Sequence, residues 1–348
     1  MNICTESSTT AYSRLQDDYS RWIYEKRAMY CLTGDSTYMT ELGESVLDMN
    51  ILNDLMRRLN EVKDRLVVRG AGNDYHVIKR MYPDFDFALF SDNDPSKIGG
   101  TIDGKEVISP DEFYENYSDY YVLVNSAAAN HEIVAELKAH GISSEKIFNL
   151  ADSYEEMCDK QYFDKKIILP EPGEVFVDGG SYDGRTIRQF ISWCDGNYNK
   201  IYAFEPDSAN CRWLKDNVGE ISNSKIEIFN RGLWDSSCEL SFSNNGNQGS
   251  KITESGENII KTISIDEAVN GDKVTFLKLD VEGAEYKALL GASETIKKHH
   301  PKLTISIYHK PEDIFELPEL ILSMWPEYHF YLRHYQLGPY ETIFYCLS

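Results

Sequence analysis

The feature that most constrains the fold of this chain is an apolar run that ends in an acid and leads directly into glycines. The run ends at Asp178, and Gly179, Gly180 and Gly184 follow. Such a pattern predicts a buried strand, a tight turn with few side chains and a helix, so that a ligand can lie against the backbone of the turn. A second apolar run ends at Glu205, 21 residues after Gly184. The order strand, glycine turn, helix, strand and acid predicts a nucleoside-binding half-fold, in which the second carboxylate binds ribose hydroxyls.

The spacing of the glycines indicates the kind of nucleoside. A dinucleotide site uses the pattern G-x-G-x-x-G, so that a pyrophosphate rests on the helix N-terminus. In this chain Asp178 precedes the turn, and Gly180 and Gly184 are four residues apart. A carboxylate in this place repels a pyrophosphate but suits a cationic ligand such as S-adenosylmethionine, which carries a sulfonium and an ammonium group. The simpler alternative is an acidic tight turn that binds no ligand.

The charge of the chain limits its partners. It has 57 acidic and 35 basic side chains, a net charge of −22, and no cluster of Lys and Arg. Proteins that bind nucleic acids or anionic membranes need a basic face, so we expect neither partner. No run approaches the length of a membrane span, and the polar residues 1–10 do not resemble a signal peptide. Seven scattered cysteines without a C-x-x-C pair predict reduced thiols and a cytoplasmic protein.

The first 152 residues show two kinds of pattern. Residues 1–62 carry apolar side chains at helical spacing, which predicts N-terminal helices that pack on their own domain or form the contact of a homo-oligomer. Residues 63–152 alternate short strands and helices and predict a small Rossmann-like domain. Its turn holds Gly70 and Gly72, but Tyr75 occupies the third glycine position. Either this domain is structural, or it recognises a sugar nucleotide near Asp92.

A charged segment, 154–166, leads into a third region, residues 165–348, which reads as five strands with helical crossovers and a closing hairpin. This order predicts a seven-stranded α/β sheet. The stretch 238–264 is rich in Asn, Gly and Ser and predicts a hairpin or flap that covers a ligand cleft. The predicted strands are 174–178, 201–205, 226–230, 275–280, 303–308, 328–333 and 342–347.

Three motifs in this region carry a resemblance to a known family. They are Val177-Asp178-Gly179-Gly180, Phe204-Glu205-Pro206 and Phe276-Leu277-Lys278-Leu279-Asp280-Val281-Glu282-Gly283-Ala284-Glu285. With them, residues 165–348 resemble the FkbM family of S-adenosylmethionine-dependent methyltransferases. The resemblance implies a seven-stranded Rossmann-like methyltransferase sheet, preceded here by the smaller Rossmann-like domain and the N-terminal helices. It also implies an O-methyltransferase that uses S-adenosylmethionine and acts on a hydroxyl of a glycan, sugar derivative or secondary metabolite.

The family pattern and the predicted strand ends give the candidate site residues. Asp280 ends one strand and is expected to accept the hydroxyl proton or to orient the hydroxyl, while Lys278 lies on the same face of that strand and is placed to contact it. His309 ends the next strand and suits a general base, with His334 in reserve. We expect no metal ion, because the acids show no fixed ligand spacing. The cofactor-binding candidates are Asp178, Gly179, Gly180, Ser181, Tyr182, Gly184, Thr186, Glu205, Pro206, Leu233 and Asp280.

Other assignments stay open for this sequence. Trp234 either sandwiches the adenine or belongs to the core. Glu282 and Glu285 either stabilise the start of a helix or take part in acceptor or metal binding. The first alternative function is a non-catalytic module of methyltransferase fold that binds S-adenosylmethionine or its product. The second is an NAD-dependent oxidoreductase that uses Gly70 and Gly72, against which the missing third glycine counts.

Overall fold

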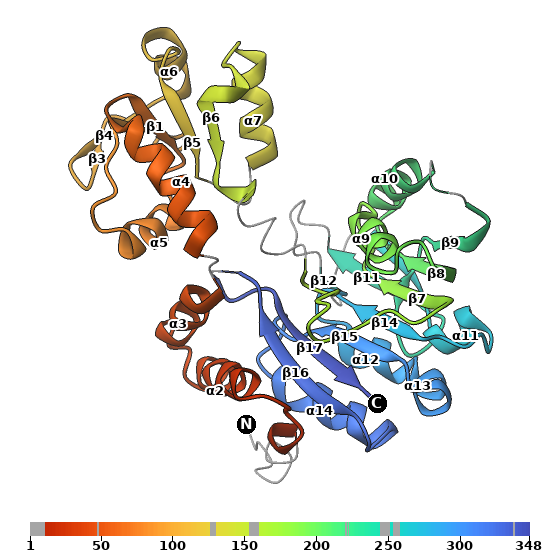
Figure 1. The fold of residues 1–348 in the computed structure, drawn as a ribbon. Coiled ribbons are helices and arrows are strands. Elements are labelled where there is room, and N and C mark those ends of the chain that lie inside the picture. Colours follow the sequence, from red (N-terminus) through yellow and green to blue (C-terminus); the bar gives the residue numbers. More distant parts are fainter. Residues whose placement is uncertain are drawn as a thin grey trace. The chain divides into compact units, whose positions relative to one another are not determined.

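The computed structural model describes residues 11–46, 49–125, 130–152, 160–219, 221, 223–243, 251–252, 258–336 and 338–348 (Figure 1). Its contacts divide the chain into two compact units. The inserted unit is Glu44–Cys158, and the larger unit combines Met1–Gly43 with Asp159–Ser348. The predicted N-terminal segment 1–62 is therefore divided between the two units.

The inserted unit has a six-stranded sheet of order β3-β4-β2-β1-β5-β6. All of its strand pairs are parallel except β3 with β4. Buried Val67, Val122 and Val124 pack with Phe113 and Leu137 of the flanking helices. The helices and strands of this unit are α4 (Met49–Glu61), β1 (Leu66–Arg69), α5 (Asn73–Met81), β2 (Leu89–Ser91), β3 (Thr101–Ile102), β4 (Lys105–Ile108), α6 (Pro110–Asn116), β5 (Tyr121–Val124), α7 (Asn130–Ala139) and β6 (Ile147–Asn149), with 3-10 turns at Lys63–Arg65 and Ser144–Lys146.

The larger unit has a seven-stranded sheet of order β16-β17-β15-β14-β7-β8-β9. The strands from β15 to β9 are parallel, and β17 is antiparallel to both β15 and β16. The predicted sheet with its closing hairpin is thus confirmed. The strands are β7 (Glu174–Gly179), β8 (Tyr198–Phe204), β9 (Ile226–Phe229), β14 (Phe276–Leu279), β15 (Lys302–Ser306), β16 (His329–His334) and β17 (Thr342–Leu347).

Helix α9 of the larger unit has one apolar, buried face. In α9 the buried residues Ile187, Phe190 and Trp193 recur every three positions, which places them on one side of the helix. Asp207 begins α10 by accepting hydrogen bonds from the N–H groups of Ala209 and Asn210. The helices are α2 (Asp18–Thr33), α3 (Thr37–Val46), α9 (Arg185–Trp193), α10 (Ser208–Val218), α11 (Ile265–Val269), α12 (Glu285–Leu290), α13 (Ser293–His299) and α14 (Asp313–Met324), with a 3-10 turn at Asn223–Lys225.

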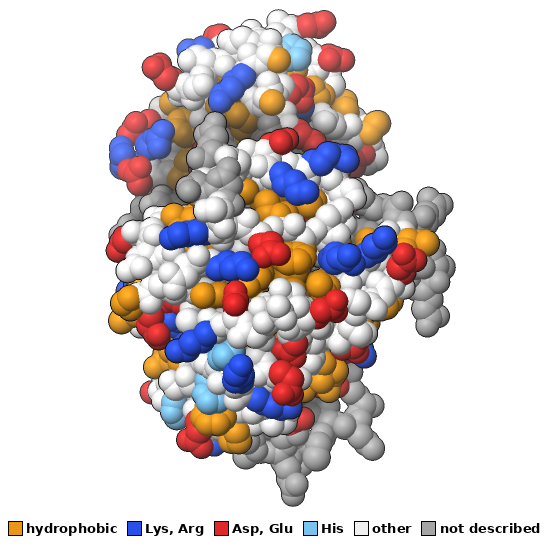
Figure 2. Space-filling model, turned by 90° about the vertical axis from the view of Figure 1, so that its right-hand side faces the viewer, with side chains coloured by type: hydrophobic (Ala, Val, Ile, Leu, Met, Phe, Trp, Pro, Cys, Tyr) orange, Lys and Arg blue, Asp and Glu red, His pale blue; other side chains and the backbone are white. Residues whose placement is uncertain are grey.

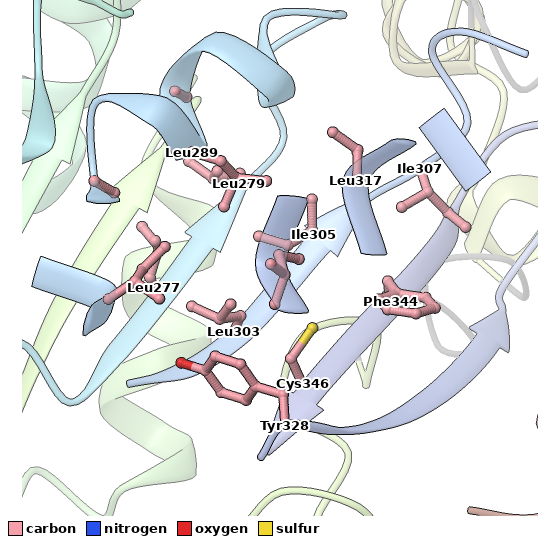
Figure 3. Packing of buried hydrophobic residues seen from close by; sticks show 14 of the residues in the cluster. Leu277, Leu279, Leu289, Leu303, Ile305, Ile307, Leu317, Tyr328, Phe344 and Cys346 are labelled. Carbon is pink, nitrogen blue, oxygen red and sulfur yellow. The ribbon is translucent and has the colours of Figure 1, made fainter. Parts of the chain in front are cut away.

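The main core lies on the face of the sheet that α12, α13 and α14 cover (Figure 3). Leu277 and Leu279 of β14 and Leu303 and Ile305 of β15 are fully buried there, against Leu317 of α14. Complete burial of such side chains stabilises the fold by about 1.5–3 kcal/mol each. The strand ends that leave this core are therefore held on a rigid base.

The stretch 238–264 forms strands of a small second sheet of order β10-β13-β11-β12. Its strands are β10 (Gly232–Leu233), β11 (Glu239–Ser243), β12 (Lys251–Ile252) and β13 (Asn258–Ile263). The pairing of β11 with β12 and β13 is antiparallel, so the predicted hairpin is present. The loop 244–250 lies outside the described residues, and its role as a lid stays a prediction.

The N-terminal helix α2 packs on the edge strand β16 and on α14. Ser20 Oγ accepts a hydrogen bond of 3.0 Å from Leu332 N, and Arg333 pairs with Asp17 at 2.7 Å. The buried Arg27 donates to the carbonyl of Tyr308 at 3.1 Å. These contacts are the physical reason why the N-terminal residues divide: α2 needs the C-terminal hairpin as its partner, while α4 belongs to the inserted unit.

The surface is mixed in charge. Acidic and basic side chains are interspersed on the face drawn in Figure 2. Among the described residues, no helix combines the length and the apolar character that crossing a membrane requires.

Candidate active site

Four neighbouring strands bring the predicted residues to one edge of the sheet. The glycine turn follows β7, Glu205 follows β8 and Asp280 follows β14, while His309 lies three residues beyond the end of β15. In the sheet, β8 lies on one side of β7 and β14 on the other. The chain therefore reverses its direction of winding between β7 and β14, and ligands of open α/β sheets bind at the carboxyl ends of the strands at such a point.

The backbone of the turn has a conformation that requires glycine. Gly180 has φ +80°, and a Cβ atom there would lie 1.9 Å from the carbonyl oxygen of Asp280. Gly184 has φ +83° and begins α9, with its Cα against Leu214 and Val218 of α10. Gly179 is restricted by packing alone, because a Cβ atom there would lie 2.7 Å from a side-chain methyl group of Leu233. The glycines thus allow β7, β14 and α10 to approach closely around the turn.

Glu205 is a buried carboxylate that faces this turn. Its Oε2 accepts a hydrogen bond of 3.1 Å from Tyr182 N, and its Oε1 accepts one of 2.9 Å from Asp207 N. Burial raises the pKa of Glu205, and the two backbone hydrogen bonds oppose that shift. Each carboxylate oxygen has a further acceptor site. Glu205 is held in one orientation and keeps the capacity to bind a diol.

The remaining cofactor candidates surround Glu205 and the turn. Ser181 is buried, and its Oγ donates to the carbonyl of Asp178 at 3.0 Å, so it supports the turn from within. Tyr182 is exposed at the rim and meets the exposed Trp213 edge to face at 5.6 Å. Thr186 is the second residue of α9 and half-buried. Pro206 follows Glu205 directly.

Leu233 and Trp234 differ in their surroundings. Leu233 is buried against Gly179. Trp234 is half-buried, and the ammonium of Lys287 lies 5.7 Å from its ring centroid. Its backbone also packs tightly, because a Cβ on Gly291 would lie 2.1 Å from the Trp234 carbonyl oxygen.

Lys278 pairs with Asp178, not with Asp280. Its Nζ lies 3.1 Å from Asp178 Oδ1 and donates to the carbonyls of Gly179 and Gly180 at 3.0 and 2.8 Å. Both side chains are essentially inaccessible, at 1% and 0% exposure. Apart from this ion pair, the carboxylate of Asp178 has no hydrogen-bond partner among the described residues. Lys278 and Asp178 are register partners on the paired strands β14 and β7, and their ion pair stabilises the turn that follows β7.

Asp280 lies above this pair in a cluster of hydroxyl donors. Tyr162 donates to its Oδ2 at 2.9 Å, and Tyr308 donates to its Oδ1 at 3.0 Å. Burial acts to raise the pKa of Asp280, but the nearby charges of Lys278 and His309 and the hydrogen bonds outweigh it, so the pKa lies below its usual value. Asp280 is a carboxylate at neutral pH in this arrangement.

His309 stands among three carboxylates. Its Nδ1 lies 2.9 Å from Glu285 Oε1, and its Nε2 lies 3.5 Å from Asp280 Oδ1 and 3.5 Å from Glu282 Oε2. Burial lowers the pKa of His309, but the interactions with the carboxylates, Glu285 first, outweigh it and raise the pKa to about 9. In this state the imidazole is cationic at neutral pH and has no free lone pair for a proton.

Sequence reasoning missed Tyr162 and Glu341 in this cluster. Glu341 has φ +57° and directs its carboxylate to the amide of Gln161 and, at 3.5 Å, to Tyr308. Burial and then the charge of Asp280 raise the pKa of Glu341 to about 7. Tyr308 was missed as well, but the sequence could have marked it, since it directly precedes His309 after a strand. Tyr162 and Glu341 come from a lead-in segment and a hairpin loop, where no local pattern marks them.

His334, the reserve base, is not part of the cluster contacts. It is buried in β16, and its Nδ1 lies 2.8 Å from the hydroxyl of Thr342. Burial, followed by the charge of Arg27, lowers its pKa to about 3. Its imidazole is neutral and structural.

Comparison with known proteins agrees with this geometry. Residues 178–335 match the family model described as the methyltransferase FkbM domain. A solved methyltransferase FkbM from Methylobacillus flagellatus KT is 20% identical with a TM-score of 0.50, and the match covers 90% of this chain and 100% of that one. Fibrillarin from Aeropyrum pernix, solved with bound S-adenosyl-L-methionine, is 12% identical with a TM-score of 0.36, covering 54% and 73%. No curated protein matches significantly.

The larger unit has a seven-stranded sheet with a candidate ligand site at the strand ends where the direction of winding reverses. This arrangement defines a Rossmann-like methyltransferase fold. Residues 178–335 are the part of the chain that matches the methyltransferase FkbM domain.

Proposed function

We propose that this protein is an O-methyltransferase that uses S-adenosylmethionine and acts on a hydroxyl of a glycan, sugar derivative or secondary metabolite. The observation that carries the proposal is the juxtaposition, at the carboxyl ends of adjacent strands, of a nucleoside-type cradle and an acidic cluster. The cradle is the glycine turn with Glu205, and the cluster is centred on Asp280. The tight packing of Gly180 against the carbonyl of Asp280 brings the two parts together.

The chain's residues fit the cofactor. Glu205 is buried and rigid, with acceptor sites left for the two ribose hydroxyls. We assign the backbone of the turn at Gly179 and Gly180 to the methionine end of the cofactor, and the half-buried Trp234, next to the buried Leu233, to the adenine. The ammonium and sulfonium groups meet an edge with an excess of carboxylates, which favours a cation.

Methyl transfer requires that the acceptor hydroxyl oxygen is held in place and that its proton is removed. Bound in the cradle, S-adenosylmethionine supplies a methyl group whose carbon bonds to the acceptor oxygen, while the sulfur keeps the electron pair of the broken bond and the hydroxyl proton departs. Asp280 is the carboxylate beside the turn, and Tyr162 and Tyr308 fix both of its oxygens. We assign it to orient the acceptor hydroxyl and receive the proton. His309 holds the position of the carboxylates around it.

Calorimetric titration with S-adenosylhomocysteine tests the cofactor. Replacing Glu205 by Gln removes a charged partner of the ribose, which is worth about 1.5–3 kcal/mol, so affinity should fall about tenfold to a hundredfold. Glu294→Gln, at an exposed carboxylate of α13, is the matched control. NAD serves as a second ligand and should not bind. If the unaltered protein does not bind S-adenosylhomocysteine, or Glu205→Gln binds it equally well, the proposed cofactor site is wrong.

The type of methyl transfer needs a separate experiment. The protein is incubated with labelled S-adenosylmethionine and pools of hydroxylated acceptors, and the products are treated with alkali. An ether made by O-methylation resists alkali, whereas a methyl ester is hydrolysed. A labelled product that is lost in alkali would contradict transfer to a hydroxyl.

A further inference from the structure

Three side chains from separate segments converge beside the proposed acceptor position. Asp280 follows β14, Glu285 begins α12 and His309 follows β15. One ligand atom from each of them lies within 4.8 Å of those of the other two. Glu282 Oε2 approaches the same imidazole, 3.5 Å from Nε2. Two carboxylates and an imidazole are thus concentrated in a volume that one ion can bridge.

The atoms of this group are also poorly satisfied. Glu285 has 0% and His309 6% of its side chain exposed. Glu285 Oε1 accepts a hydrogen bond of 2.8 Å from Val281 N, but its Oε2 has no hydrogen-bond partner among the described residues. His309 Nδ1 contacts Glu285 Oε1 at 2.9 Å, whereas Nε2 has only the two carboxylate contacts at 3.5 Å. A buried polar atom without a hydrogen-bond partner destabilises the fold, so its presence in a native site calls for a ligand.

The surrounding cations do not balance the carboxylates. Lys278, the ammonium below the cluster, is engaged by Asp178 and two carbonyls. Around the imidazole, Asp280, Glu282 and Glu285 present three carboxylates within 3.5 Å of a ring nitrogen. A divalent cation would neutralise two of these charges and supply the missing partners at once.

We propose that Asp280, Glu285 and His309 bind a divalent metal ion, which replaces the proton that the imidazole carries in its absence. Mixed oxygen and imidazole ligands favour a first-row ion such as Mn²⁺ over Ca²⁺, which prefers an all-oxygen shell. Three protein ligands are fewer than an octahedral ion takes, so further positions would stay open. The role of the ion rests on the proposed function: an open position holds the acceptor oxygen and increases its acidity. This proposal replaces the expectation, from the ligand spacing in the sequence, that no metal binds.

The first experiment measures the ion without any cofactor. The full-length protein is treated with chelator and dialysed, and Mn²⁺ is added while free Mn²⁺ is followed by electron paramagnetic resonance. We expect one bound ion per chain. Glu285→Gln keeps the shape of the side chain and an acceptor for Val281 N, so the fold should persist, yet the affinity should fall at least tenfold. Glu294→Gln, exposed on α13, should bind as the unaltered protein does.

A second variant guards against misfolding of the first. Asp280→Asn removes one ligand charge from a different segment and should weaken Mn²⁺ to a similar degree, and circular dichroism of both variants confirms the fold. Absence of stoichiometric binding would overturn the proposal. Binding that neither variant weakens would do the same, since the ion would then lie elsewhere.

S-adenosylhomocysteine titrations on the same samples separate this proposal from the proposed function. We expect the chelated protein to bind the nucleoside with unchanged affinity, because Glu205 and the glycine turn are not ligands of the ion. Mn²⁺ binding without nucleoside binding supports the metal site and refutes the cofactor site. Nucleoside binding without Mn²⁺ binding refutes the metal site alone.

Discussion

The buried pair of Lys278 and Asp178 gives the sharpest prediction, because it distinguishes a structural lysine from a catalytic one. In Lys278→Met the hydrophobic stem is retained while the ammonium is lost. Asp178, with 0% exposure, then keeps a charge without its partner, and the carbonyls of Gly179 and Gly180 lose their donor. Breaking a buried ion pair by removing one partner costs about 3–5 kcal/mol.

The larger unit can be observed separately. All five tryptophans of the chain belong to it, so tryptophan fluorescence reports its unfolding without a contribution from the inserted unit. A unit of this size loses about 2–4 °C of melting temperature per kcal/mol, so Lys278→Met should melt about 6–20 °C lower. The control Lys297→Met removes an ammonium whose side chain is 51% exposed and should shift the transition little.

The double variant Lys278→Met, Asp178→Asn decides the cause. With both charges removed, no uncompensated charge remains, and we expect more than half of the lost stability to return. The reasoning is refuted if Lys278→Met has the same melting temperature as the control Lys297→Met, or if the double variant is no more stable than Lys278→Met alone. A catalytic role for Lys278 would instead predict a normal melting temperature and lost turnover.

Two further predictions concern the turn and the buried histidine. Gly180→Ala should abolish S-adenosylhomocysteine binding, because the added Cβ would collide with the Asp280 carbonyl. The control Gly271→Ala has φ +86° and open space around the Cβ, so it introduces only backbone strain. Equal binding by both variants would contradict the prediction. His334 has a folded pKa of about 3 against 6.5 in the unfolded chain, so between these pH values only the unfolded chain takes up its proton. Stability should therefore fall with decreasing pH in that window, by up to about 1.4 kcal/mol per pH unit, and His334→Asn should flatten the dependence of the melting temperature on pH. An unchanged slope would assign the acid sensitivity to other groups.

The central strands could be predicted from the sequence because both of their faces are buried. β7 has a continuous apolar run that ends in an acid, and in β14 only Lys278 interrupts the apolar run before Asp280. The short strands β3 and β4 were missed, since two to four residues contain no period. The helix α6 was missed although Ser109 caps it and Pro110 begins it, which is a local signal that could have been used.

The partners of predicted elements were harder to find than the elements. An amphipathic stripe shows that a helix is buried on one side, but not against what, so the attachment of α2 to β16 could not be predicted. The same holds at the site. Asp280 and His309 were marked by their strand ends, whereas Tyr162 and Glu341 reach them only through the tertiary fold.

The division of the larger unit has a consequence for its synthesis. Helix α2 is synthesised before the inserted unit, whereas its partners β16 and α14 are synthesised after it. The apolar and cationic side chains of α2, including Arg27, therefore lack these partners while the whole inserted unit is synthesised and folds. Contacts of such long sequence separation form late and slowly. Folding of the larger unit therefore cannot be completed until the residues that follow the inserted unit have been synthesised.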